Sequence, residues 1–269
     1  MDFRLDPAID QLRRRVRAFV EARLIPLEAD RANYDEHDNL REDVLARMRG
    51  EAREAGIWAL QSPKARGGGG LPFVAMAACY EEMNRSIFGP AAFNCAAPDD
   101  GNMMVLERVG SDAQKAFFLP GIARGDISIA LGYSEPDHGS DLAGIRTSAK
   151  RTEDGGWVVN GQKIFTSTAG FSQYVWLAAR TDPANQRHGG ISVFLVPLDT
   201  PGITIQPMSG LNGHRANVVF FDDVKLPADA LVGPENGGWK LITDALAFER
   251  ETVGAIGAAT APVGGVQGA

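Results

Sequence analysis

The chain has 269 residues, 44% hydrophobic and 23% charged, which is the composition of an ordinary globular protein that can bury a sizeable core. Its 27 basic and 34 acidic residues give a formal net charge of -7. This balance argues against a chain-wide basic surface for nucleic acid or anionic membrane, so we expect neither as a partner.

The N-terminal segment and the cysteines indicate where the protein works. Residues 1–20 contain acidic side chains from the second position and no uninterrupted apolar run, which is typical of neither a signal peptide nor a membrane span. The two cysteines, Cys79 and Cys95, do not suggest a disulfide scaffold. We therefore expect a cytoplasmic protein with no integral membrane segment.

The first half of the chain has helical patterns. Apolar residues at steps of three and four predict a helix within residues 5–20, and further helices are predicted over about 40–55, 73–87 and 101–118. Four glycines at 67–70 lack the preceding strand and the following Lys-Ser/Thr of a phosphate loop, so they predict a plain loop.

From about residue 126 the pattern changes to short aromatic and β-branched runs bounded by Gly, Pro, Asn or Asp. Such runs predict strands of an antiparallel sandwich or barrel. They are WVVNG (157–161), YVWLAAR (174–180), ISVFLVPLD (191–199), GITIQPM (202–208) and NVVFFDDVKL (217–226). A helical pattern returns at 238–258, so the order is helical, β, helical.

Several common catalytic signatures are absent from the sequence. The four histidines are scattered and none pairs with a cysteine at metal-ligand spacing. Neither the G-x-S-x-G motif of α/β-hydrolases nor a G-x-G-x-x-G between a strand and a helix occurs, so no sequence motif supports a hydrolase or a Rossmann dinucleotide-binding domain. Two polar, glycine-marked turns remain as candidates, YSEPDHGSD (133–141) and NGQKIFTST (160–168).

These two turns carry groups that suit a polar and flat ligand. Ser134, Ser140 and the amides around Gly139 can present hydrogen bonds. Phe165 and Ser167 are two residues apart, so on a strand they share one face and could meet an aromatic cofactor together. Spacing alone favours the alternative, an ordinary hairpin in which the serine caps a turn and the phenylalanine packs in the core.

Both turns resemble the flavin-binding segments of the acyl-CoA dehydrogenase family, whose usual forms are T-E-P-x-x-G-S-D and N-G-x-K-x-W/F-I-T/S. Other segments resemble family signatures in the same order: PKARGGGGL, PDDGNMMVLERVGSDAQKAFFLPGIARGDI, FLVPLDTPGI, VVFFDDVKLPADALVG and LAFER. The resemblance implies an α+β chain. An N-terminal helical domain would span 1–128, a middle antiparallel β-sandwich or barrel domain holding FAD 129–234, and the beginning of a C-terminal helical bundle 235–269.

The resemblance also implies roles for the residues of the two turns. Ser134 stands where the family hydrogen-bonds the flavin pyrimidine edge, and Gly139 and Ser140 stand where the pyrophosphate is cradled, with Ser140 also touching substrate. Phe165 takes the place of the aromatic residue that packs on the flavin. Ser167 takes the place of the hydroxyl that approaches N5.

The implied reaction is α,β-dehydrogenation of an acyl-CoA thioester, in which a carboxylate removes the α-proton and a hydride passes to flavin N5. The pair Glu249 and Arg250, in LAFERETVG, resembles a family pair that supplies the base and a contact to the CoA side. The alternative is a solvated, charged helix face. Glu251, two residues further on, points to a different side of the helix and is a weaker candidate.

The end of the chain raises a second hypothesis. Family members usually continue well beyond the Glu-Arg pair, whereas this sequence ends at Ala269, so we expect a chain without most of the C-terminal helical domain. It is then either an oxidoreductase of fatty acid metabolism or a non-catalytic protein that binds acyl-CoA or a partner. The family implies electron-transfer flavoprotein as the electron acceptor, and a homodimer or homotetramer when the full bundle is present. An oxidase of the same superfamily is also compatible.

Overall fold

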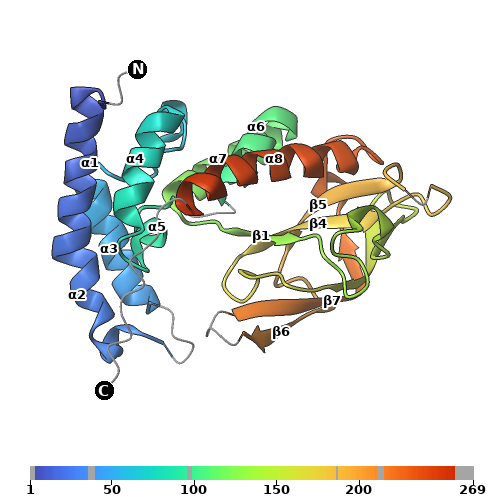
Figure 1. The fold of residues 1–269 in the computed structure, drawn as a ribbon. Helices are drawn as coiled ribbons and strands as arrows, with labels where there is room; N and C mark the ends of the chain where they lie inside the picture. The colour runs from blue at the N-terminus through green and yellow to red at the C-terminus, as the bar shows by residue number, and fades with distance from the viewer. Residues whose placement is uncertain (1–3, 36–39, 96–98, 186, 211–214, 258–269) are drawn as a thin grey trace. The chain divides into compact units, whose positions relative to one another are not determined.

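The computed structural model describes residues 4–35, 40–95, 99–185, 187–210 and 215–257, without the side chains of 100, 215 and 248–257 (Figure 1). Contacts divide the chain into two compact units, Met1–Asp100 with Glu249–Ala269, and Gly101–Phe248. The predicted domain boundaries after 128 and 234 stay predictions. Within the described residues, no helix has the length and apolar character needed to cross a membrane.

The first unit is helical, as predicted. The opening helix α1 (Pro7–Phe19) begins at Asp6, whose carboxylate accepts a hydrogen bond from the Ala8 amide at 2.8 Å. A π-helical turn (Val20–Leu24) and α2 (Ile25–Glu28) follow, then α3 (Glu42–Glu54), α4 (Phe73–Met83) and α5 (Gly89–Ala92). Their apolar faces form one core, which includes Val16, Val20, Leu24, Met48, Ala52, Cys79, Tyr80, Met83 and Phe93.

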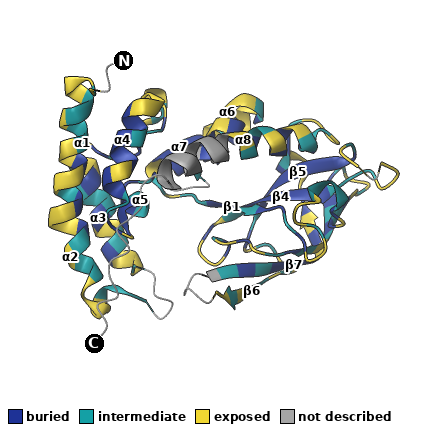
Figure 2. Ribbon diagram, in the orientation of Figure 1, coloured by how far each residue is buried: buried dark blue, intermediate teal, exposed yellow. Residues whose placement is uncertain are grey.

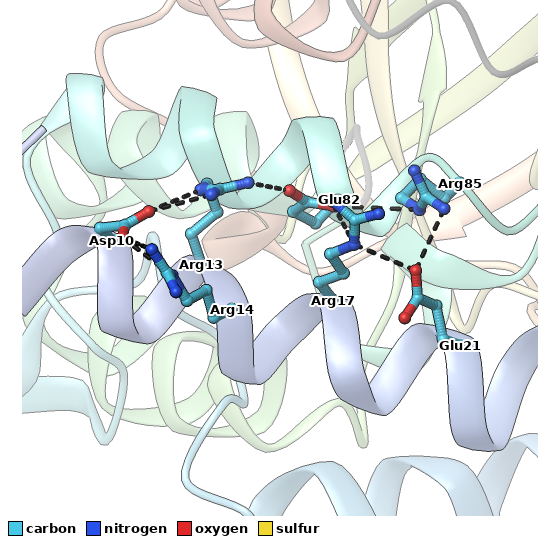
Figure 3. A network of polar contacts seen from close by, with 7 residues as sticks. All are labelled: Asp10, Arg13, Arg14, Arg17, Glu21, Glu82 and Arg85. Atoms are coloured by element: carbon cyan, nitrogen blue, oxygen red, sulfur yellow. Dashed lines mark hydrogen bonds and ion pairs between the residues drawn. The ribbon is translucent and has the colours of Figure 1, made fainter. Parts of the chain in front are cut away.

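A charged network joins α1 to α4 (Figure 3). The Glu82 side chain on α4 is only 3% exposed and accepts a hydrogen bond from Arg13 of α1. The Nε atoms of Arg17 and Arg85 lie 4.0 and 3.9 Å from its other oxygen. A buried carboxylate surrounded by guanidinium groups keeps its charge compensated, and it fixes how the two helices pack.

The four glycines fold back on the preceding turn, which agrees with the predicted plain loop. A Cβ on Gly68 would lie 2.2 Å from the Ser62 carbonyl oxygen, and one on Gly69 would lie 2.8 Å from that of Leu60. Only glycine permits so close a backbone approach. The run therefore has a packing role within the chain.

Two helices occupy the segment where the sequence predicts one, α6 (Asp99–Val109) and α7 (Asp112–Arg124). The break comes at Ser111, which accepts a hydrogen bond from the Gln114 amide while the Gln114 side chain accepts one from the Ser111 amide. This capping box starts a new helix. The side-chain nitrogen of Gln114, Nε2, donates to the carbonyls of Asp229 and Leu231, at 2.9 and 3.0 Å.

The second unit is built on one eight-stranded sheet. Its strands are β1 (Ile129–Gly132), β2 (Ser148–Arg151), β3 (Trp157–Lys163), β4 (Tyr174–Arg180), β5 (Ile191–Pro197), β6 (Ile203–Ser209), β7 (Arg215–Leu226) and β8 (Leu231–Val232). The order is β6-β7-β3-β2-β4-β5-β8, with β1 beside β4. Most pairs are antiparallel, as predicted, but β1 and β2 both run parallel to β4.

The sheet has a core on each face. Alternate residues of β4 and β5, such as Val175, Leu177 and Phe194, pack against Trp157 and Val219 of β3 and β7. The residues between them pack against α6, α7 and α8 (Gly238–Gly257); these are Trp176, Ala178, Val193 and Leu195. Figure 2 accordingly shows β4 and β5 in dark blue, and their near-continuous apolar sequence follows from burial on both faces. The predicted order of helical domain, β domain and closing helix is confirmed.

Candidate functional site

The two turns singled out in the sequence lie side by side in the second unit. The first follows β1, whereas the second begins within β3 and continues beyond the end of that strand at Lys163. The Ser134 carbonyl accepts a hydrogen bond from the Ile164 amide at 2.9 Å. Groups that are thirty residues apart in the sequence therefore meet at one place, as the flavin-site hypothesis requires.

A buried ion pair underlies this meeting point. Lys163 Nζ lies 2.8 Å from Glu135 Oε1, with the two side chains 0% and 6% exposed. Burial lowers the pKa of Lys163 to about 8, although the Glu135 carboxylate favours the ammonium. Burial also opposes the charge on Glu135, but Lys163 and its hydrogen bonds outweigh this and hold the pKa of that carboxyl below its ordinary value.

Sequence reasoning missed both members of this pair. They are the Glu and the Lys of the two quoted motifs, so their presence in both turns was the available signal. Spacing gives no indication that a charged side chain is buried, and exposed lysines and glutamates are far commoner.

The first turn presents Gly139 and Ser140 to solvent. The turn is closed by two backbone hydrogen bonds between Glu135 and His138, at 3.0 and 3.1 Å. Gly139 and Ser140 are exposed, and a Cβ placed on Gly139 would meet no atom within 4 Å. Nothing within the described chain requires glycine there, so the open space over its backbone is available to a ligand.

The second turn differs from its prediction. Phe165 and Ser167 follow the end of β3 at Lys163, so they do not share the face of a strand. Phe165 has a left-handed backbone with a φ of 60°, and its side chain is 64% exposed. The alternative in which this ring packs in the core is therefore wrong. Asn217 supports the turn by donating to the carbonyls of Thr166 and Ser167, at 2.8 and 3.3 Å.

The residues of the two turns fit a flat cofactor with polar edges. A left-handed conformation is costly for a non-glycine residue, and strain of this kind is concentrated at functional sites. Here it holds an aromatic ring in solvent, next to the exposed hydroxyl of Ser167. The buried Thr166 hydroxyl has no hydrogen-bond partner among the described residues. This combination suits the isoalloxazine of FAD, whose ring is apolar on its faces and hydrogen-bonding at its edge.

The predicted base and CoA contact are not described at side-chain level. Glu249 and Arg250 belong to helix α8, but their side chains lie outside the described residues. The parts of the chain that are described contain no group of three or more His, Cys, Asp or Glu side chains arranged to hold a metal ion.

Comparison with known proteins identifies the class to which this architecture belongs. The model of the acyl-CoA dehydrogenase N-terminal domain matches residues 6–126, and that of the acyl-CoA dehydrogenase middle domain matches residues 130–224. Residues 6–126 and 130–224 thus match two domains of one family in consecutive order. The chain belongs to the acyl-CoA dehydrogenase family.

Individual relatives agree with this assignment. The acyl-CoA dehydrogenase FadE29 of Mycobacterium tuberculosis is 36% identical over 254 residues, which are 94% of this chain and 63% of FadE29. The solved steroid ACAD Tcur3481-Tcur3483 is 34% identical with a TM-score of 0.81, over 96% of this chain and 65% of that one. A putative acyl-CoA dehydrogenase from Mycobacterium abscessus is 34% identical with a TM-score of 0.82, over 94% and 67%. The chain thus spans about two thirds of the length of these relatives.

Proposed function

We propose that this protein takes part in the FAD-dependent α,β-dehydrogenation of an acyl-CoA thioester. The observation that carries the proposal is the pair of adjacent turns, tied by the hydrogen bond between Ile164 and Ser134, with the Phe165 ring held in solvent by a left-handed backbone. The family supports the same reaction class.

FAD would be held by five residues of these turns. Ser134 would bond the pyrimidine edge, Gly139 and Ser140 the pyrophosphate, and Phe165 would pack on the ring with Ser167 near N5. Ser140 would also contact the substrate. When bound, FAD supplies the acceptor for the hydride that leaves the β-carbon.

The proton chemistry would fall to helix α8. We assign removal of the α-proton to Glu249 and a contact with the CoA portion to Arg250, on the Glu-Arg pair in LAFERETVG. A carboxylate fixed over the α-carbon gains the advantage of near-attack positioning, and an apolar surrounding raises the basicity available to it.

The flavin absorbance of the purified chain, read together with its mass, tests cofactor binding. A yellow protein whose flavin bleaches anaerobically on adding an acyl-CoA supports the enzyme; straight-chain, branched and steroid acyl-CoA thioesters distinguish the substrate classes. A colourless protein that still binds acyl-CoA would instead support the non-catalytic alternative.

Glu249→Gln tests the proposed base, and Glu251→Gln, two residues further along the helix, is the matched control. We expect Glu249→Gln to retain bound flavin and lose substrate bleaching by at least 100-fold in rate, the size of effect that general bases contribute. Glu251→Gln should bleach normally. Unchanged bleaching by Glu249→Gln would remove this residue from its role.

The finer setting of the enzyme is also part of the proposal. We place the enzyme in the cytoplasm and in fatty acid metabolism. Its electron acceptor would be electron-transfer flavoprotein, and its assembly would be a homodimer or a homotetramer. Cys79 and Cys95 are buried and form no disulfide, which suits a reducing compartment. Burial raises the pKa of the Cys79 thiol to about 11, so it is not a reactive thiolate at neutral pH. Reduction of added electron-transfer flavoprotein by the substrate-treated protein would test the acceptor.

A further inference from the structure

The ion pair between Glu135 and Lys163 has more hydrogen bonds than a simple charge pair requires. Lys163 Nζ also donates to the Tyr133 carbonyl at 3.1 Å. Glu135 Oε1 accepts from the Thr147 amide at 2.9 Å, and Oε2 accepts from the Arg146 amide at 2.7 Å. Two side chains thereby fix three separate backbone segments.

The buried Glu135–Lys163 ion pair is expected to add little to the free energy of unfolding. Two charges that leave water lose their hydration, and a well-packed apolar pair of similar volume is often at least as stable. The lowered pKa of Lys163 shows that burial works against its charge even beside Glu135. The directional bonds of the pair are what an apolar replacement could not reproduce.

Those directional bonds act next to the proposed flavin contacts. Glu135 directly follows Ser134, and Lys163 comes two residues before Phe165. The hydrogen bond from the Ile164 amide to the Ser134 carbonyl runs between the same two segments. A shift of either turn along the other would have to break the ion pair, because both buried side chains are also held by hydrogen bonds to the surrounding backbone.

We propose that Glu135 and Lys163 are positioning residues, which set the register in which Ser134 and Phe165 are presented to the isoalloxazine of FAD. The inference rests on the proposed function. Glu135 and Lys163 are 7% and 0% exposed, so they act through their neighbours and need not touch the cofactor.

The test separates register from stability by neutralising both partners together. Glu135→Gln and Lys163→Met each leave one buried charge without the opposite charge beside it, and both should lower the unfolding midpoint. The double variant carries no buried charge, so it should recover at least half of that loss. Titration of each purified full chain with FAD gives the dissociation constant, and visible circular dichroism at saturating FAD reports how the ring is held.

We expect the double variant to bind FAD at least tenfold more weakly than the unaltered protein, with a changed flavin circular dichroism spectrum. The control is Glu235→Gln, which removes a surface ion pair with Arg151 (2.8 Å, side chains 34% and 48% exposed) and should leave both readouts unchanged. A stable double variant with unaltered affinity and spectrum would overturn the positioning role.

Two further outcomes are also decisive. Should the double variant fail to fold, Glu135→Asp keeps the charge but shortens the side chain by one methylene, and we expect at least a fivefold loss of FAD affinity; unaltered affinity overturns the role. Should the unaltered protein bind no FAD, the proposed function fails and the positioning role fails with it. Normal FAD binding by the unaltered protein, together with unaltered affinity and spectrum in the double variant, rejects the positioning role alone.

Discussion

Replacing Phe165 by glycine should leave the stability of the protein nearly unchanged while it weakens FAD binding. Phe165 is the site residue whose backbone and side chain conflict, because a left-handed φ of 60° is unfavourable for phenylalanine and its ring is 64% exposed. Glycine adopts this conformation without strain.

The expected magnitudes follow from these two values. About a third of the ring is buried, so its removal costs roughly 0.5–1 kcal/mol of the 1.5–3 kcal/mol for a fully buried phenylalanine. The added backbone freedom of glycine costs about 0.5–1 kcal/mol. Relief of the left-handed strain returns about 1–2 kcal/mol. The free energy of unfolding should therefore change by less than about 1 kcal/mol.

Cofactor affinity should respond differently. Stacking of an aromatic side chain on a flat heteroaromatic ring is worth about 1–3 kcal/mol, so FAD should bind about 5- to 150-fold more weakly. Phe171 provides a matched control, since it is also 64% exposed but has no left-handed backbone. Phe171→Gly should destabilise the protein by about 1–2 kcal/mol and leave FAD affinity unaltered.

Urea unfolding and FAD titration of the two variants are the measurements. Phe165→Gly with FAD affinity within twofold of the unaltered protein would refute the assignment of this ring to the flavin. A loss of stability in Phe165→Gly as large as that in Phe171→Gly would refute the strain argument.

Three further changes test other parts of the structure. Glu82→Gln should lower the free energy of unfolding by about 1–3 kcal/mol, because a 3% exposed carboxylate loses its charge among three arginines. The exposed control Glu21→Gln should lower it by less than about 1 kcal/mol. Urea unfolding compares the two variants, and equal losses would contradict the burial argument. Arg180→Lys should cost about 1–3 kcal/mol, since the guanidinium donates to five backbone carbonyls that an ammonium cannot span; an unchanged unfolding midpoint would contradict this. The pKa of Glu135 is lowered in the folded protein, so this group contributes stability above the ordinary glutamate pKa of about 4.3, and that stability is lost as the pH falls through the lower folded pKa. As the pH is lowered from about 5, the unaltered protein should therefore lose more stability than Glu135→Gln. Parallel pH profiles of stability would show that the pair does not titrate in this way.

Long periodic segments were predictable from the sequence, and short ones were not. The apolar stripe of α1 and the aromatic runs of β4 and β5 carry their own pattern. Strands β1, β2 and β8 have four, four and two residues, so their state is decided by pairing with β4, β3 and β5. The break between α6 and α7 was readable as a capping box, since Ser111 stands three residues before Gln114.

The site was predictable in its residues but not in its geometry. The motifs pointed to both turns, yet the strand rule placed Phe165 and Ser167 on a common face, whereas the structure ends β3 at Lys163 and turns the next residues through a left-handed conformation. A local conflict of this kind is set by tertiary contacts, here the Asn217 bonds and the Glu135–Lys163 pair. The roles of Glu249 and Arg250 rest on resemblance alone.

The sandwiching of β4 and β5 between two cores also has a consequence during synthesis. The apolar face of α7, which carries Phe118, Leu119 and Ile122, packs on Trp176 and Leu195. Helix α7 ends at residue 124, and Leu195 is made about 70 residues later. At ~5–20 residues per second this interval is about 4–14 s, during which the ribosome-bound chain displays an uncovered apolar helix that a chaperone could bind. Because α7 precedes β4 and β5 along the chain, its apolar face stays uncovered until those strands have been synthesised.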